Sequence, residues 1–192
     1  MLFEFDASWN LFMINVAIYV LIVVVQRHVD VWLPQRTFNP THRRYRAFRW
    51  EREGDFYRDV LKIDHWKDHL PCLDGRNHFS KKTLTGRRPD YLEQFVIETC
   101  RAESNHVTAI LSVVVMRVWT PFDLWLVCFV LAIVGNVPFI CIQRYNRPRL
   151  QRTLVSIEQR RIARGYAPRP AIEARATDEQ SNRHTPHSYY AT

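Results

Sequence analysis

Apolar runs separated by strongly basic segments dominate the pattern of this 192-residue chain. The first run, Leu11–Val25, has Asn15 as its clear polar break. Two further runs, Val107–Trp119 and Phe122–Ile142, are separated by Thr120-Pro121. An α-helix needs about 20 apolar residues to cross a hydrocarbon core of about 30 Å. The pattern therefore predicts about three transmembrane helices, of which the last two form a hairpin that turns at Thr120-Pro121.

Equal helical rise on the two arms of this hairpin predicts which residues lie at the same depth. A residue i on the first arm lies level with roughly residue 241 − i on the second. His106 then lies beside Gly135-Asn136, and Glu103 lies beside Pro138. Glu103 and His106 share a helix face because they are three residues apart. Polar groups are costly inside a membrane, so we expect a functional site about 10 Å inside the Arg144 end of the hairpin.

The net charge of +8 is unevenly placed along the chain. Glu4 and Asp6 precede the first apolar run, whereas arginines follow the first and the last runs. Basic residues beside a span mark its cytoplasmic side, which predicts a multi-pass protein of the cell membrane with its N-terminus outside and its C-terminus cytoplasmic. A basic protein can also bind nucleic acid, but three apolar runs argue against this interpretation, and we expect no nucleic-acid partner.

The predicted fold class is an all-α integral membrane protein with a cytosolic amphipathic segment and a disordered C-terminal tail. Apolar spacing predicts an amphipathic helix over Gly54–Trp66. A helix that begins at Tyr91 should run on into Val107, with Leu92, Phe95, Val96 and Thr99 on its buried face. The expected segments are an N-terminal transmembrane helix (1–32), a cytosolic or interfacial segment (33–90), the membrane hairpin (91–150), an amphipathic interfacial helix (151–165) and a tail (166–192) with little to bury.

The Glu103-x-x-His106 pair is compatible with two kinds of chemistry. In one, His106 is a general base that Glu103 orients and makes more basic. In the other, the pair is half of a di-iron site, which needs a second copy on another helix, and the sequence has one copy. A polar helix end that meets water and headgroups is the non-functional alternative. Nearby hydroxyls could form a covalent intermediate or bond a carbonyl one turn back; they belong to Ser104, Thr108 and Ser112.

Two weaker patterns lie in the cytosolic segment. His65 and His69 are four residues apart and could both contact a metal, but no third ligand of suitable spacing follows, so we expect no metal site. His69 and Asp74 match the His-x4-Asp arrangement of glycerolipid acyltransferases, although Pro71 interrupts it. A pattern with two fixed positions is easily met by chance.

Several short motifs together resemble the glycosyl-4,4'-diaponeurosporenoate acyltransferase family of carotenoid biosynthesis. They are Trp66-Lys67, Leu73-Asp74-Gly75, Arg101-Ala102-Glu103 with His106, Asn136-x-Pro138, and the octapeptide QRYNRPRL at Gln143–Leu150. The resemblance covers roughly Trp66 to Leu150, and the octapeptide is its most specific part. It implies a small multi-pass membrane enzyme that esterifies the sugar 6-hydroxyl of a glycosylated carotenoid acid with a fatty acyl chain.

Acyl transfer to a sugar hydroxyl needs a base, a donor for the developing oxyanion, and an anchor for the activated acyl group. We expect His106 to be the base, Glu103 to orient it, and Asn136 to be an oxyanion or sugar donor. Arginines at the cytosolic mouth suit the phosphates of an acyl-CoA or an acyl-carrier protein, with no bound cofactor, and their alternative use is topology and headgroup contact. The expected substrate and acyl-donor contacts are Trp66, Lys67, Arg101, Gln143, Arg144, Asn146, Arg147 and Arg149.

The expected partners are a glycosylated carotenoid or another glycolipid, a fatty acyl donor and membrane lipids. A different class of function is also open. A small non-catalytic scaffold could bind neighbouring enzymes of lipid biosynthesis through the QRYNRPRL surface.

Overall fold

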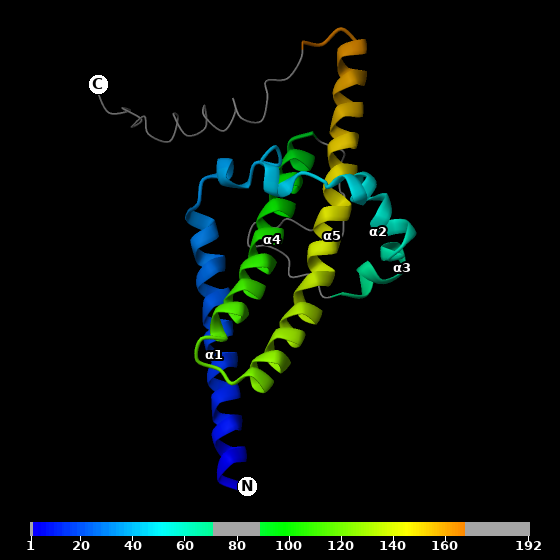
Figure 1. Cartoon of the computed structure of the whole chain (residues 1–192). Coiled ribbons are helices and arrows are strands. Elements are labelled where there is room, and N and C mark those ends of the chain that lie inside the picture. Colours follow the sequence, from blue (N-terminus) through cyan, green and yellow to red (C-terminus); the bar gives the residue numbers. More distant parts are fainter. Residues whose placement is uncertain (1, 71–88, 168–192) are drawn as a thin grey trace, which may run out of the picture.

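The computed structural model describes residues 2–70 and 89–167, and every regular element in these ranges is helical. Three long helices, α1 (Leu2–Trp32), α4 (Pro89–Met116) and α5 (Phe122–Ala163), form the body of the fold. Short helical turns follow α1 and lie across the upper parts of α4 and α5 (Figure 1). They are η1 (Gln35–Phe38), η2 (Arg43–Tyr45), η3 (Arg49–Gly54), α2 (Asp55–Asp59), α3 (Ile63–Trp66) and η4 (Lys67–His69).

The hairpin of α4 and α5 is the main packing unit. Helix α4 ends at Met116, and α5 begins at Phe122, so the predicted turn at Thr120-Pro121 is confirmed. Near this turn, Val113 and Met116 pack against Ala132. At the other end, the four residues expected on the buried face of the first arm are all buried, and three of them form a cluster with Leu150: Leu92, Phe95 and Val96.

Helix α1 packs against the hairpin and is fastened to its turn by Asn15. This buried side chain donates to the Thr120 hydroxyl at 3.0 Å and accepts from the Trp119 indole N–H at 3.0 Å. The polar break in the first apolar run therefore satisfies two polar groups of the turn. Because an unpaired buried polar group costs about 1–3 kcal/mol, this contact favours one register of α1 against the hairpin.

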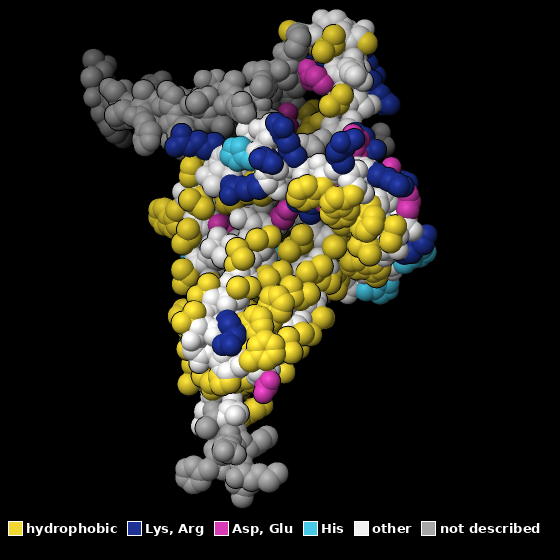
Figure 2. All heavy atoms as spheres, in the orientation of Figure 1, with side chains coloured by type: hydrophobic (Ala, Val, Ile, Leu, Met, Phe, Trp, Pro, Cys, Tyr) yellow, Lys and Arg dark blue, Asp and Glu magenta, His cyan; other side chains and the backbone are white. Residues whose placement is uncertain are grey.

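Two helices are long and apolar enough to cross a membrane, and they lie within Ser8–Asp30 and Phe122–Ala163. Only 6% and 11% of their apolar windows are buried inside the protein, whereas the core helix of a soluble protein would be mostly buried. Figure 2 shows the result on one face, where apolar side chains cover the lower part and Lys and Arg side chains gather above them. The third expected span, Val107–Trp119, forms the last turns of α4 and the turn that follows it. Among the described residues, α4 does not meet the length and hydropathy criteria that identify the other two helices as candidate membrane spans.

Two sequence-based expectations about helices were wrong. Gly54–Trp66 is not one amphipathic helix, because the chain breaks between α2 and α3 at Lys62, whose φ of 50° is left-handed. The break lets Tyr57 and Ile63 both pack against Tyr145 of α5. The expected boundary at Leu150 is also absent, since α5 continues as one helix through Pro138 and Pro148 to Ala163. The expected disordered tail lies outside the described residues from 168 onward.

Candidate active site

His106 of α4 and Asn136 of α5 face each other across the hairpin. The His106 Nδ1 atom lies 2.9 Å from the Asn136 side-chain oxygen. The Asn136 amide nitrogen donates to the Ala132 carbonyl at 2.8 Å and to the Tyr19 hydroxyl of α1 at 3.0 Å. The Phe139 ring stacks on the imidazole with ring centres 4.9 Å apart. Residues of three helices thus meet around Asn136, at the depth on α5 that the hairpin count predicts for His106.

A cluster of four buried charges lies toward the Leu150 end of the hairpin. Arg144 donates to Glu51 and to Glu103, each at 2.5 Å, and Arg147 forms an ion pair with the other oxygen of Glu103. Arg147 also donates to the Tyr45 carbonyl at 2.7 Å and to Thr99. Two carboxylates and two guanidinium groups balance in charge, as buried ionic groups must if they are to avoid a large desolvation cost.

Glu51 enters this cluster from the segment between α1 and α4, on a strained piece of backbone. Arg52, Glu53 and Gly54, which follow it, all have positive φ values, of 47°, 54° and 101°. Such conformations cost of order 1–3 kcal/mol for a residue other than glycine and persist only where surrounding contacts impose them. Here the contacts are a bidentate pairing with Arg144 and a hydrogen bond of 2.5 Å from the Tyr57 hydroxyl.

The same contacts determine how Glu51 ionises. Burial opposes the charged carboxylate, but hydrogen bonds from Arg144, Tyr57 and the Phe48 amide outweigh it, and the pKa of Glu51 lies below its ordinary value. Burial, followed by the hydrogen bond to Glu51, raises the pKa of Tyr57. Glu51 is therefore a structural anion at neutral pH, and Tyr57 remains a neutral donor to it.

These contacts bear on three of the predicted site residues. Arg144 and Arg147, expected at an open mouth, are buried, because Glu51 and Glu103 neutralise them inside the protein. Both carboxylate oxygens of Glu103 accept from these arginines. Its expected role in orienting His106 stays a prediction, whereas the Asn136 side-chain oxygen lies within hydrogen-bond distance of the imidazole Nδ1.

Trp66 and Lys67 lie against α5 beside the cluster. Lys67 donates to Asp64 at 2.7 Å, and its ammonium group lies 5.3 Å from the centre of the Tyr145 ring. The Tyr145 hydroxyl also donates to Asp64, at 2.9 Å. Hydrogen bonding from Lys67 is the largest influence on Asp64, and it holds the pKa of that carboxyl below its ordinary value. The Trp66 indole donates to the Leu61 carbonyl at 2.8 Å.

The remaining predicted contacts differ in exposure. Arg149 is exposed, and its guanidinium lies over the Tyr145 ring at 4.6 Å. Arg101 pairs with Glu98 at 2.5 Å on its own helix. Gln143 is buried and Asn146 is half-buried. The structure therefore brings His106 and Asn136 together and places Glu103, Arg144 and Arg147 in the charge cluster, while it leaves Arg149 accessible from outside.

Other chemistries receive little support from the described residues. No group of three or more His, Cys, Asp and Glu side chains in the described ranges could hold a metal ion. His69 is described, but Asp74 of the His-x4-Asp pattern is not. The Ser112 hydroxyl donates to the Ala109 carbonyl at 2.7 Å, which is the expected bond to the preceding turn. The Cys100 thiol is fully buried, so a substrate cannot reach it as a nucleophile.

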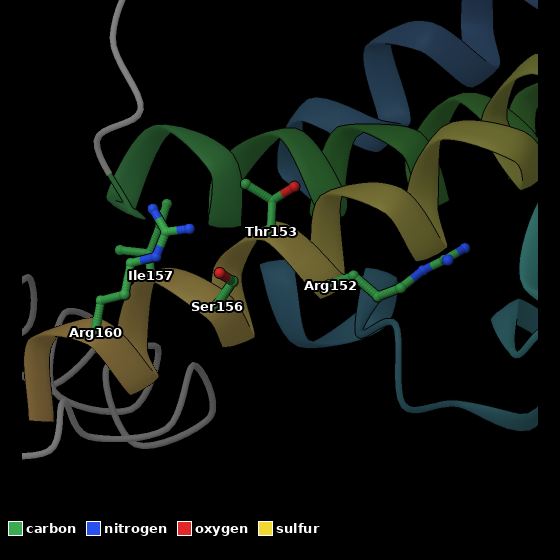
Figure 3. Close-up of a pocket in the computed structure, with 5 residues that line it drawn as sticks. All are labelled: Arg152, Thr153, Ser156, Ile157 and Arg160. Carbon is green, nitrogen blue, oxygen red and sulfur yellow. The ribbon is translucent and has the colours of Figure 1, made fainter. Parts of the chain in front are cut away.

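A cavity of about 310 Å³ lies far along α5 (Figure 3). Two basic side chains, two hydroxyl side chains and one apolar side chain line the cavity: Arg152, Thr153, Ser156, Ile157 and Arg160. Arg152 is 16 residues beyond Asn136 on the same helix, which corresponds to about 24 Å. This cavity is therefore separate from the surroundings of His106.

Sequence reasoning missed two residues of the site. Tyr19 lies in an apolar run that reads as lipid-facing, but it follows Asn15 by four residues, so the two polar groups share one helix face. That spacing could have identified it. Glu51 is 93 residues from Arg144, and no local pattern predicts such a pairing.

Comparison with known proteins gives the family. The sequence model described as glycosyl-4,4'-diaponeurosporenoate acyltransferase matches residues 41–156. Proteins of that name from Staphylococcus aureus strains bovine RF122 / ET3-1 and N315 are 33% and 31% identical over 132 residues, which cover 67% of this chain and 78% of each relative. No solved structure matches the chain. The motifs, the matched residues and these relatives agree: the chain is an acyltransferase and belongs to the glycosyl-4,4'-diaponeurosporenoate acyltransferase family.

Proposed function

We propose that this protein is a membrane acyltransferase that esterifies a sugar hydroxyl of a glycosylated carotenoid, or of a related glycolipid, with a fatty acyl chain. The names of its relatives support the acceptor class, since those proteins are described as acting on glycosyl-4,4'-diaponeurosporenoate. The observation that carries the proposal in this chain is the histidine of α4 held against α5 by Asn136 and Phe139.

His106 acts as the general base of the reaction. The sugar hydroxyl gives its proton to the imidazole as its oxygen attacks the acyl carbonyl, and a tetrahedral oxyanion forms. Collapse of this intermediate breaks the bond to the carrier thiol, which takes the proton back from the imidazolium. The products are a sugar ester and a free thiol, so the imidazole is regenerated. The Phe139 ring that stacks on the imidazole carries no exchangeable proton, so it takes no part in this transfer.

The protein works in the membrane, with three spans, its N-terminus outside and its C-terminus cytoplasmic. The support is the low internal burial of the apolar windows in α1 and α5, together with the arginines that follow both helices. The turn of the hairpin then lies on the side of the N-terminus. In this arrangement the apolar part of a carotenoid lies in the bilayer while its sugar reaches His106.

The acyl donor, an acyl-CoA or an acyl-carrier protein, approaches from the cytoplasmic end. Arg144 and Arg147 are already neutralised by carboxylates, so the exposed Arg149 is the better contact for a phosphate. Lys67 and Trp66 lie beside Tyr145 at the same level as Arg149. These residues form the entrance that the sequence assigned to substrate and donor.

Replacing His106 with alanine tests the proposal. Membranes that contain the His106→Ala protein, supplied with acyl-CoA and a glycosylated carotenoid, should form ester at least about 100-fold more slowly, as expected for loss of a general base. His65→Ala, a change of the same kind at an exposed histidine, should keep the wild-type rate. Ester formation by His106→Ala at the wild-type rate would remove His106 from the mechanism.

The lipid profile of cells separates the enzyme from a scaffold. A cell with His106→Ala in place of the wild-type protein should lack the acylated glycolipid while the protein stays in the membrane at its normal amount. A scaffold would tolerate the single substitution, because His106 lies between helices and away from the QRYNRPRL segment. A normal lipid profile in that cell would favour the scaffold.

A further inference from the structure

The hydrogen bonds around Asn136 determine which way its amide group points. A backbone carbonyl oxygen accepts hydrogen bonds and cannot donate them. The side-chain atom that lies 2.8 Å from the Ala132 carbonyl must therefore be the nitrogen. The oxygen of the amide then faces His106 Nδ1, at 2.9 Å. The opposite orientation would set two acceptors against each other at the Ala132 carbonyl.

This orientation fixes the proton on the imidazole. The Asn136 oxygen can only accept, so His106 Nδ1 must carry the hydrogen. In the neutral ring, the lone pair then belongs to Nε2. Asn136 thus has the position that an Asp or Asn occupies beside the histidine of nucleophilic hydrolases, where it sets the tautomer and the ring orientation.

Both amide hydrogens of Asn136 are already donated. One goes to the Ala132 carbonyl and the other to the Tyr19 hydroxyl at 3.0 Å. Asn136 could donate to an acyl oxyanion only by giving up one of these bonds. A role in holding His106 therefore fits its contacts better than the oxyanion role that the sequence suggested.

Tyr19 completes the arrangement from a different helix. Its hydroxyl accepts from Asn136 and its ring packs with the cluster of Val113, Met116 and Ala132. The residue belongs to α1, outside the segment 41–156 that the family model matches. The site at His106 thus depends on a helix that precedes the family-defining part of the chain.

We propose that Asn136 and Tyr19 are positioning residues, which hold His106 as the Nδ1–H tautomer and leave Nε2 as the base of the acyl transfer. The proposal rests on the proposed function. Asn136 and Phe139 of α5, which lie against the imidazole, are neutral, and Tyr19 of α1 contacts Asn136 on its other side. On its own helix the nearest titratable group is Glu103, whose carboxylate is paired with Arg144 and Arg147.

The pH profile of kcat/KM for ester formation tests this assignment. In Asn136→Asp, the carboxylate still accepts from Nδ1 and adds a negative charge, which raises a neighbouring pKa by about 1–3 units. The acidic limb should therefore move upward by at least about one pH unit, with KM unchanged. Asn136→Leu keeps the size of the side chain but removes the acceptor, and kcat should fall at least about 100-fold.

Tyr19→Phe removes one hydrogen bond to Asn136, which is worth about 0.5–1.5 kcal/mol. We expect kcat to fall about 3-fold to 10-fold with KM unchanged and the acidic limb to move slightly downward. Tyr166→Phe, the same change at an exposed tyrosine near the end of α5, should leave kcat and the profile at wild-type values.

Two results would overturn the assignment: an unmoved acidic limb in Asn136→Asp, or a wild-type kcat in Asn136→Leu. The His106→Ala assay keeps this failure distinct from failure of the proposed function. If His106→Ala is inactive and the limb of Asn136→Asp does not move, His106 is the base but Asn136 does not set its tautomer. If His106→Ala is active, the base itself is elsewhere.

Discussion

Glu103→Gln should be among the most destabilising single changes of a side chain in this protein. The substitution keeps the shape of Glu103 but removes one of the two negative charges that neutralise Arg144 and Arg147. Arg147 would keep hydrogen bonds to Thr99 and to the Tyr45 carbonyl but would lose the Glu103 carboxylate with which it is paired. Breaking a buried ion pair in this way typically costs about 3–5 kcal/mol.

A matched control separates this effect from the loss of any surface ion pair. Glu98 lies on the same helix and pairs with Arg101 at 2.5 Å, with side chains 21% and 22% exposed. This pair is half-buried and reaches solvent, and pairs at this helical spacing on an exposed surface contribute about 0.3–0.5 kcal/mol. Glu98→Gln should therefore lower the free energy of unfolding by less than about 1 kcal/mol. The measurement is denaturant-induced unfolding of the purified proteins in detergent micelles, followed by tryptophan fluorescence.

A double variant tests the charge balance directly. Glu103→Gln combined with Arg147→Met removes one negative and one positive charge, which leaves Arg144 paired with Glu51. Residues in one ionic network show coupling of about 0.5–3 kcal/mol. The double variant should therefore be more stable than the sum of the two single losses predicts. Additive losses, or a Glu103→Gln cost no larger than that of Glu98→Gln, would refute the reasoning.

Two further predictions concern the backbone and pH. Gly54→Ala should destabilise the protein by at least about 1 kcal/mol, because Gly54 has a φ of 101° and an added Cβ would lie 3.2 Å from the Tyr145 carbonyl oxygen. Gly135→Ala should instead stabilise helix α5 by about 0.5–1 kcal/mol, because an added Cβ there meets nothing within 4 Å. Thermal unfolding measures both variants, and equal effects would contradict the distinction. The lowered pKa of Glu51 means that its contribution to stability is present above the ordinary value of 4.5 and is lost as the pH falls through the folded-state pKa. Glu51→Gln should therefore flatten the acid limb of the stability curve, and an unchanged limb would show that other carboxylates determine it.

Periodicity and counting predicted the hairpin well, because its geometry depends on local properties. The apolar runs located the helices, and Thr120-Pro121 located the turn. Equal helical rise then placed His106 beside Gly135-Asn136, and the structure shows the Asn136 oxygen 2.9 Å from the imidazole. Each of these steps uses only the spacing of residues within two neighbouring helices.

The charge cluster could not be predicted in this way. Arg144 and Arg147 follow an apolar run, where arginines usually mark the cytoplasmic side. Their burial depends on Glu51, which a strained turn 93 residues earlier brings against α5. The break at Lys62 was missed for the same kind of reason, since packing of Tyr57 and Ile63 on Tyr145 outweighs the helical spacing of that segment.

Helix α5 is longer than a bilayer is thick. At 1.5 Å per residue its 42 residues extend about 63 Å, while a bilayer with its headgroups is about 40–45 Å thick. In the proposed topology, the C-terminal end of α5 therefore stands roughly 20 Å clear of the bilayer. Arg152 and Arg160 lie on this projecting end, where a water-soluble molecule would contact them before it reached the lipid.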